Sequence, residues 1–432
     1  STGLYSSAAS DVYKRQDIAS IFKQILSVST TFVSASVPIN VFNKSEFLDN
    51  LYIALFEAEE NGRPRWVGNL KRLRLVLNAE EVTETLADGS TATTVLENVI
   101  VDTQNRLAFS SSGRSKGKLN TNILTYWSNS NGKEVTPIPD DPETNPAFAL
   151  EDDEQLGRDG RSVDRGGAGQ KIPGYIDGNN PGDDNGGTGR TLFTDFDGSL
   201  AALNVSNASL AAWQTALDVS GDADAAEEIL KFIRGQAVNG DGVADNNDSS
   251  ESRPWIMGDP IHSRPFPINY GLLGNHTAAN PDIRIIIGAN DGFFRMFKNT
   301  DEAGTDTGNE VWAYMPQELL SIQKDLMANN PTDPVTHIYG VDGTPVIYAA
   351  DKYHRDDDGN IVAGGDGTLN HADGDKVYAY FGLRRGGSAY YALDISNPDS
   401  PSYLWKIKAE GDFSELGETF STPRVTMVKY SV

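Results

Sequence analysis

The residues best suited to bind a ligand lie in one acidic loop, whose sequence is DKYHRDDDGNIVAGGDG. Asp356, Asp358 and Asn360 place side-chain oxygens on alternate residues of this loop. Val362 follows where a backbone carbonyl could serve as a ligand, and Asp366 could supply a closing carboxylate. Because calcium takes about six to eight hard oxygen ligands from a flexible loop, the spacing predicts a Ca²⁺ site. The alternative is a solvated acidic turn between two strands.

A second acidic loop shares part of this pattern, with Asn239, Asp241, Asp245 and Asp248 as candidate ligands. Alternating polar residues around a central glycine are typical of EF-hand-like and thrombospondin-type calcium loops. The first ligand position holds Ala237, so one carboxylate is missing. A weaker calcium site and a plain loop both stay open as interpretations.

Residues that could perform catalysis do not form a recognisable motif. No GxSxG elbow, Walker A loop or GxGxxG fingerprint is present, and the chain has no cysteine to act as a nucleophile or metal ligand. His262, in GDPIHSRP, is expected to be a neutral structural histidine. We therefore predict a binding protein and not an enzyme. The five histidines are scattered along the chain: His262, His276, His337, His354 and His371.

The 432-residue chain is strongly acidic. Its 36 Lys and Arg residues stand against 61 Asp and Glu residues, giving a net charge of −25 at pH 7. Nucleic-acid binding is not expected, because phosphate recognition needs clustered Lys and Arg, and anchoring on anionic lipid is not expected either. No apolar run is long enough to span a bilayer. The acidic excess suits binding of hard divalent cations or solubility at high salt.

Short strands dominate the expected secondary structure. Two apolar, partly alternating runs within 51–77 flank a turn at Asn61-Gly62, which predicts a β-hairpin. Helical spacing is found at 208–234, with Gly235 placed to end the helix. After residue 253, strand–turn–strand units end in aromatic-rich strands, as in propeller blades. We expect a mainly β protein: an incomplete, modified β-propeller preceded by a mixed, β-rich region with a few helices.

Aromatic residues of the later strands alternate with aliphatic ones. This pattern favours packing within the blades over a stacking platform for ligands. The residues concerned are Trp312, Tyr314, Tyr390, Tyr391 and Trp405.

Composition divides the chain into five expected segments. The first lacks the apolar core of a signal peptide and is expected to be an adapter-derived or disordered tail, with any export signal lying upstream. The last is expected to stop before the final blades. The segments are 1–16 (tail), 17–128 (β-rich N-terminal region), 129–207 (Gly/Asp-rich loops), 208–252 (helical segment and acidic loop) and 253–432 (β-propeller blades).

Ten stretches carry a resemblance by their order along the chain: LYIALFEAEENGRPRWVGNLKRLRL (51–75), GGAGQKI (166–172), RTLFT (190–194), ILKFIRG (229–235), RPWIMGDPIHSRP (253–265), IIIGANDGFFRMF (285–297), GNEVWAYMP (308–316), YGVDGTPVIYAA (339–350), GSAYYALDISNP (387–398) and LGETFSTPRV (416–425). Together they resemble the PilY1 family of type IV pilus-associated adhesins and assembly factors. That family pairs a variable N-terminal region with a C-terminal modified β-propeller.

The resemblance also bears on calcium. In that family a propeller loop with Asp-x-Asp-x-Asn-x-Val-x-Asp spacing binds calcium and tunes pilus extension against retraction. Asp356, Asp358, Asn360 and Val362 match this spacing, whereas Gly364 stands at the last position, where Asp366 would have to substitute.

The resemblance implies partners and a location as well. The partners would be minor pilins, other type IV pilus machinery, and a host or abiotic surface, with the protein outside the cell at the pilus tip. No Arg-Gly-Asp motif is present, so integrin binding is not implied. A quinoprotein dehydrogenase is the enzyme alternative, because those enzymes use a similar propeller, although several bind their quinone against a vicinal cysteine pair. A calcium-stabilised surface or matrix protein is a third possibility.

Overall fold

The computed structural model describes residues 32–36, 49–59, 62–85, 90–110, 118–128, 159–172, 190–236, 238 and 253–426, apart from residues 121, 161, 197, 254 and 333–335. The strands are β1 (Phe32–Ser36), β2 (Asn50–Glu57), β3 (Val67–Val76), β4 (Glu80–Thr85), β5 (Thr91–Leu96), β6 (Val99–Val101), β7 (Leu192–Phe196), β8 (Ser199–Ala202), β9 (Phe266–Asn269), β10 (Ile283–Gly288), β11 (Phe294–Lys298), β12 (Glu310–Met315), β13 (Val346–Ala350), β14 (Tyr353–Arg355), β15 (Ile361–Ala363), β16 (Lys376–Gly382), β17 (Ala389–Asp394) and β18 (Ser402–Lys408). The α-helices are α2 (Ala211–Ala216), α3 (Ala223–Arg234) and α4 (Gln323–Ala328), and the 3-10 helices are η4 (Gly169–Lys171), η5 (Val205–Ser209), η6 (Gln317–Leu319) and η7 (Gly411–Phe413).

The N-terminal sheet has the strand order β1-β2-β3-β6. Its centre is the antiparallel hairpin of β2 and β3, with Leu51 opposite Leu73, so the hairpin predicted from the sequence is confirmed. Successive side chains of a strand point to opposite faces. Tyr52 therefore joins the cluster that faces the rest of the molecule, whereas Leu51 and Ile53 pack into a separate cluster on the other face.

The central sheet has the order β8-β7-β12-β11-β10-β9. Strands β9 to β12 follow one another as an antiparallel meander, and β7 adds to β12 in parallel. Strands β7 and β8 lie within 129–207, where loops alone were expected, so that expectation is wrong at 192–202. The reason is that glycine and asparagine upstream dominate the composition of the segment and mask one short strand pair.

The C-terminal sheet repeats the meander, in the order β13-β16-β17-β18 with every pair antiparallel. The small hairpin β14–β15 is inserted between its first two strands. The fold is mainly β, as expected. The described sheets are open, so the propeller stays a prediction.

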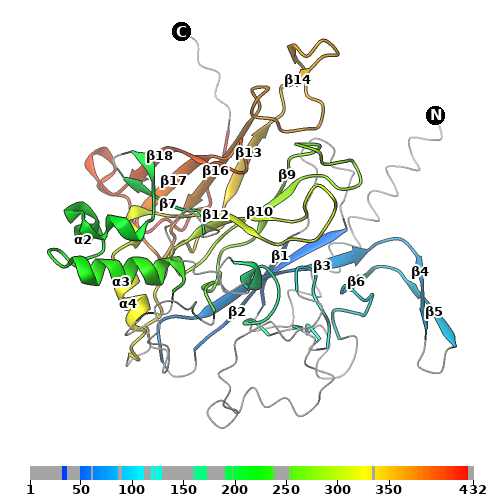
Figure 1. The fold of residues 1–432 in the computed structure, drawn as a ribbon, viewed down its shortest axis with the longest axis horizontal. Coiled ribbons are helices and arrows are strands. Elements are labelled where there is room, and N and C mark those ends of the chain that lie inside the picture. Colours follow the sequence, from blue (N-terminus) through cyan, green and yellow to red (C-terminus); the bar gives the residue numbers. More distant parts are fainter. Residues whose placement is uncertain are drawn as a thin grey trace.

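The three sheets are stacked in chain order, with blue, green-yellow and orange layers following one another in Figure 1. One face of the central sheet packs on the C-terminal sheet through aromatic rings. Phe294 stacks on Phe381 at 4.3 Å between ring centroids, Phe381 stacks on Tyr391 at 5.4 Å, and Tyr314 meets Phe381 edge-on. These rings are fully buried. The expected packing role is thus confirmed for Tyr314 and Tyr391, whereas Trp405 is 40% exposed.

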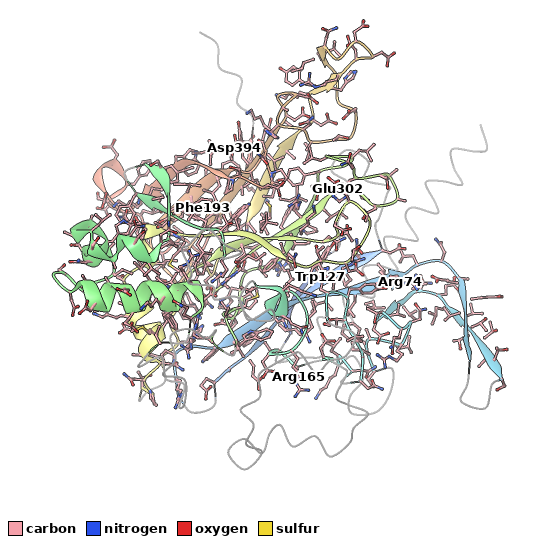
Figure 2. The ribbon with its side chains drawn as sticks, viewed as in Figure 1. Arg74, Trp127, Arg165, Phe193, Glu302 and Asp394 are labelled. Atoms are coloured by element: carbon pink, nitrogen blue, oxygen red, sulfur yellow. The ribbon has the colours of Figure 1, made fainter. Side chains whose placement is uncertain are left out.

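The other face of the central sheet packs on the N-terminal sheet. Ile285 and Ile287 of β10 share one buried cluster with Tyr52 of β2. Trp127, labelled in Figure 2, lies in the same cluster, stacks on Tyr52 at 5.7 Å and donates its indole N–H to the Asn299 carbonyl at 3.0 Å. Both faces of the central sheet are therefore buried, which explains the apolar run from Ile285 to Ile287 in β10.

Helical structure forms where the sequence predicts it, but in two pieces. Helix α3 begins after Asp222, whose carboxylate accepts the Ala225 N–H at 2.9 Å, and ends at Gly235 with φ of 105°. These are a typical N-cap and C-terminal glycine. Gly221, with φ of 84°, separates α3 from the shorter α2. Ile229 and Ile233 of α3 pack into the main core.

A buried chain of charges joins the segment before β7 to β12 and β11 within the central sheet. Glu310 accepts hydrogen bonds from Arg190 at 2.7 and 2.9 Å and from Arg295 at 3.0 Å. Arg295 also bonds Asp291, and both guanidiniums lie over the Phe293 ring. Burial alone would raise the pKa of Glu310, but the two arginines outweigh it, so this pKa lies below its usual 4.5.

The aromatic contact between the central and C-terminal sheets should dominate stability. Phe381→Ala removes a fully buried ring and leaves a cavity, so we expect the free energy of unfolding to fall by about 3–5 kcal/mol. Phe413→Ala truncates a ring that is 52% exposed and should change it by less than about 0.5 kcal/mol. Urea denaturation measures both values. Similar losses in the two variants would show that the sheets are not held by this contact.

The Glu310 network should make stability pH-dependent. Glu310→Gln leaves two buried guanidiniums undercompensated and should cost about 3 kcal/mol at pH 7. Because the folded-state pKa of Glu310 is depressed, its stabilising effect is present above the unfolded value and is lost as pH falls through the folded value. The stability gap between wild type and Glu310→Gln should therefore narrow below pH 4.5. A gap independent of pH would contradict this, and exposed Glu415→Gln is the control.

Candidate functional site

The predicted calcium loop forms the hairpin β14–β15, which projects from the C-terminal sheet at the top of Figure 1. Tyr353 pairs with Ala363 near its base and Arg355 pairs with Ile361 near its tip. The hairpin is bonded to the segment before β16, through the Tyr353 N–H to Asp375 at 3.1 Å and the Arg355 guanidinium to Asp373 at 2.7 Å. Most of its residues are nevertheless exposed. A ligand in solution can therefore reach its tip.

The tip brings Asp356, Asp358 and Asn360 together. One carboxylate oxygen of Asp356 accepts the backbone N–H groups of Asp358 at 3.1 Å and Asn360 at 2.8 Å. This is the way aspartate stabilises a tight turn, and Gly359 supports it with φ of 81°. The hydrogen bond from the Asn360 backbone lowers the pKa of Asp356. The carboxylate is thus kept in the charged form that a cation needs.

The backbone carbonyl of Val362 is already used in the pairing of β14 with β15. Val362 lies opposite His354 in the ladder. Hydrogen bonds join Asp356 to Asn360 and Lys352 to Gly364, and antiparallel ladders bond every second pair. The Val362 carbonyl therefore accepts the His354 N–H, which leaves one lone pair for another partner.

Asp366 is not brought to the tip. Its N–H lies 3.3 Å from a carboxylate oxygen of Asp351 at the base of the hairpin, and its own carboxylate accepts the Thr368 N–H at 2.8 Å. Gly364, at the last position of the spacing, has φ of 128°, which side-chain-bearing residues rarely adopt. The backbone found here is therefore adapted to glycine and not to a fifth ligand.

The tip fits calcium in ligand type and falls short in ligand number. Two carboxylates and one amide oxygen are hard donors, but the Asn360 side chain here turns its NH₂ group toward Asp356 at 3.3 Å and would have to rotate to offer its oxygen. The remaining positions would be left to water. The Arg355 guanidinium donates to the Gly359 carbonyl at 3.0 Å and is also paired with the Asp373 carboxylate at 2.7 Å, so a compensated ion pair lies beside the tip. Among the described residues, no three acidic or histidine side chains cluster as a ready-made metal site. The second predicted loop, Asn239, Asp241, Asp245 and Asp248, lies outside the described residues.

His262 has a role that the sequence did not predict. Its Nδ1 lies 2.8 and 2.9 Å from the two carboxylate oxygens of the fully buried Asp342, which is also bonded by Arg384 at 3.3 Å. His262 and Asp342 are 80 residues apart. His262 is followed by Arg264-Pro265, which leads into β9, and Asp342 is followed by Thr344-Pro345, which leads into β13. Each of these strands begins a meander. That internal repeat was the available signal, and it was missed.

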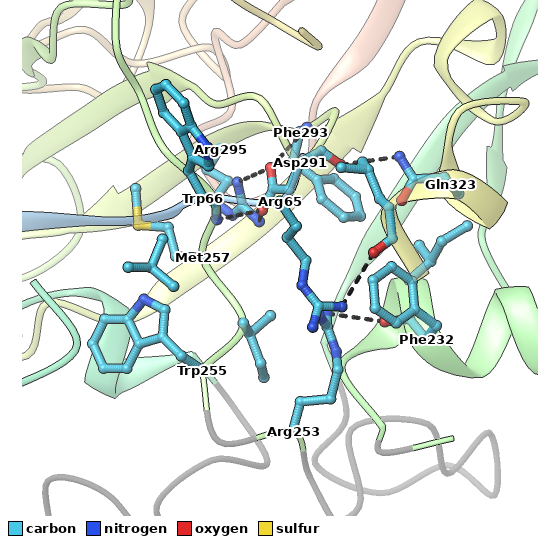
Figure 3. Close-up of a pocket in the computed structure, with 15 residues that line it drawn as sticks. Arg65, Trp66, Phe232, Arg253, Trp255, Met257, Asp291, Phe293, Arg295 and Gln323 are labelled. Carbon is cyan, nitrogen blue, oxygen red and sulfur yellow. Dashed lines mark hydrogen bonds and ion pairs between the residues drawn. The ribbon is translucent and has the colours of Figure 1, made fainter. Parts of the chain in front are cut away.

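A small cavity lies between the N-terminal sheet, α3 and the central sheet (Figure 3). Its volume is about 30 Å³, enough for about two waters. Arg253 covers the Phe232 ring at 3.9 Å, and Trp255 donates its indole N–H to the Gly68 carbonyl at 2.9 Å. The cavity is a packing gap at a junction and is too small for a substrate.

Among the helices described, none is long and apolar enough to cross a membrane.

Comparison with known proteins gives one group of relatives. The chain is 26% identical over 259 residues to the type IV pilus biogenesis factor PilY1 of Pseudomonas aeruginosa strain PAK, covering 56% of this chain and 20% of that protein. It is 27% identical over 241 residues to PilY1 of strain UCBPP-PA14, covering 51% and 18%. The PilY1 homolog of Xylella fastidiosa strain Temecula1 is 26% identical over 228 residues, covering 49% and 16%.

The chain spans about a fifth of the length of the curated relatives it matches. No protein-family model matches it, and no solved structure does. Over about half of its length, the chain is thus similar to proteins named type IV pilus biogenesis factor PilY1.

Proposed function

We propose that this chain is part of a calcium-dependent adhesin that sits at the tip of type IV pili and takes part in pilus assembly and retraction. Its similarity to relatives named type IV pilus biogenesis factors carries this proposal. Minor pilins and the pilus machinery would be its partners, and a host or abiotic surface its target. Its location would be outside the cell. The protein would act by binding and not by catalysis.

Calcium would bind at the tip of the β14–β15 hairpin. Asp356, Asp358 and Asn360 would hold the ion with their side-chain oxygens, and the second lone pair of the Val362 carbonyl could complete the set after a small rearrangement. Asp366 would contribute only if the hairpin refolded, because it lies at the base against Asp351. Calcium would supply a fixed double positive charge that rigidifies the projecting hairpin. Weak binding is therefore part of the proposal.

The stacked meanders would be successive blades of a modified propeller. Strands β9–β12 form one antiparallel four-stranded unit in chain order, and β13 with β16–β18 forms the next. The second strand of each unit ends in a glycine, Gly288 in β10 and Gly382 in β16, and the two make matching contacts. A side chain at Gly288 would collide with Val341, and one at Gly382 would collide with Thr419, so each unit touches the start of the one after it. Such repetition is what propellers require.

The hairpin proposal predicts calcium binding that depends on Asp358. Isothermal titration should show a single site whose affinity falls at least about ten-fold in Asp358→Ala, because a carboxylate ligand is lost. Asp412→Ala removes another exposed acidic side chain and should leave the isotherm unchanged. Identical heats in Asp358→Ala and wild type would remove the ion from this hairpin.

The pilus proposal predicts direct binding to a minor pilin. Immobilised minor pilins of the source organism should retain the chain, and calcium should strengthen retention of wild type but not of Asp358→Ala. Retention that is independent of calcium would keep the pilus partner and reject calcium dependence. No retention of either the chain or the full-length protein would refute the assembly role.

A further inference from the structure

A small polar cavity lies where the two meanders and the segment that follows them meet. We call it the junction pocket. Its volume is about 50 Å³, and its lining includes His262, Thr344, Arg384, Ser421 and Thr422. All of these except Arg384 come from three successive repeats of one motif: His-Ser-Arg-Pro at 262–265, Asp-Gly-Thr-Pro at 342–345 and Phe-Ser-Thr-Pro at 420–423. Arg384 lies in the turn between β16 and β17. The pocket thus forms at equivalent places of consecutive units.

Arg384 is held toward this pocket by an unusual backbone. Its φ is 55°, in the left-handed region that residues with side chains seldom occupy. The backbone N–H groups of Leu383 and Arg384 both donate to the Thr419 hydroxyl oxygen, at 2.9 and 3.1 Å, which fixes that conformation. The guanidinium lies 5.1 Å from the centre of the Phe420 ring. It has five N–H donors and, within the described part of the chain, makes one hydrogen bond, to Asp342.

His262 presents its second ring nitrogen. Asp342 accepts the Nδ1–H, which fixes the ring and directs Nε2 away from this carboxylate. Nε2 has no hydrogen-bond partner among the residues described, and the side chain is 27% exposed. The other neighbouring ring is Tyr339, at 6.2 Å. The titratable and charged groups around the imidazole are therefore Asp342, Arg384 and Tyr339.

Charge and size select the ligand. The positive charge of Arg384 and the negative charge of the buried Asp342 cancel. The net charge of the pocket is therefore zero when His262 is neutral and +1 when His262 is protonated. It can compensate one negative charge and not two. Its volume of about 50 Å³ holds about three to five water-sized atoms. A planar guanidinium fork matches a carboxylate.

We propose that the junction pocket binds a carboxylate group, with the Arg384 guanidinium and His262 Nε2 as its main donors and the hydroxyls of Ser421 and Thr422 beside it. Because Nδ1–H is donated to Asp342, Nε2 can donate only in the imidazolium form. The carboxylate would belong to a small free acid or to an acidic side chain of a protein partner. This site is independent of the calcium hairpin and of the pilus proposal.

Nuclear magnetic resonance of the imidazole nitrogens tests the site directly. The chain has five histidines, and His262→Gln identifies the signals of His262. Titration with acetate should move these signals to saturation, with the largest change at Nε2, which donates to the carboxylate. Arg384→Met should weaken binding at least about ten-fold, since a charge-assisted hydrogen bond is lost. Arg384→Lys keeps the charge without the fork and should give an intermediate value.

Control variants distinguish a loss of carboxylate binding from a loss of folding. A second ligand shows whether the carboxylate belongs to a free acid or to a protein partner. Arg355→Met removes a guanidinium from the distant hairpin and should leave acetate binding unchanged, and the amide spectrum of each variant reports whether it is folded. A peptide with one glutamate and blocked termini replaces acetate in a second arm. Tighter binding of the peptide assigns the pocket to a protein partner, and binding of acetate alone assigns it to a free acid. No response to either, a response retained in Arg384→Met, or equal binding of sulfate would overturn the proposal.

Discussion

Burial of both faces of the central sheet is the constraint on which the rest of the structure depends. Strand β10 sends Ile285 and Ile287 to the N-terminal sheet and Ile286 to the main core. A strand buried on both faces gains apolar burial from every side chain, and it needs a neighbour on each side to do so. The N-terminal and C-terminal sheets provide those neighbours. Stacking follows from this requirement, and the hairpin and the junction pocket are features of its edges.

Polar groups inside such a stack have to be paired, and they lie where elements join. Glu310 pairs with Arg295 of β11 and with Arg190, which lies just before β7. Lys71 of the N-terminal sheet is buried against Asp159 and donates to the Asp159 and Gly160 carbonyls at 2.9 Å. An unpaired charge at these depths would cost several kcal/mol. These contacts therefore fix which elements meet and in which register, while the apolar faces supply most of the stabilisation.

Local features of the fold could be predicted from the sequence, whereas long-range contacts could not. The hairpin around Gly62 and the end of α3 at Gly235 follow from residue preferences over a few positions. The pair Phe294–Phe381 joins residues far apart in the chain, and no local pattern indicates it. For His262–Asp342 the repeated segments before β9 and β13 were a signal, but a repeat does not say that its two copies touch.

The candidate site shows the same division. The spacing brings Asp356, Asp358 and Asn360 to one turn because alternation is a local property. Asp366 was expected to close the set, but strand pairing holds it at the base of the hairpin beside Asp351. The family resemblance was visible because short stretches recur in a fixed order along the chain, and their order does not depend on contacts.

A rigid stack that carries a projecting, ion-ordered hairpin is the central claim. Hydrogen–deuterium exchange with and without calcium tests it most directly, since exchange reports local opening of each element. The account predicts slow exchange in β10, β11 and β16 under both conditions, and protection of residues 353–363 only when calcium is present. Exchange at 353–363 that is the same in both conditions, or fast exchange throughout β10 and β16, would contradict it.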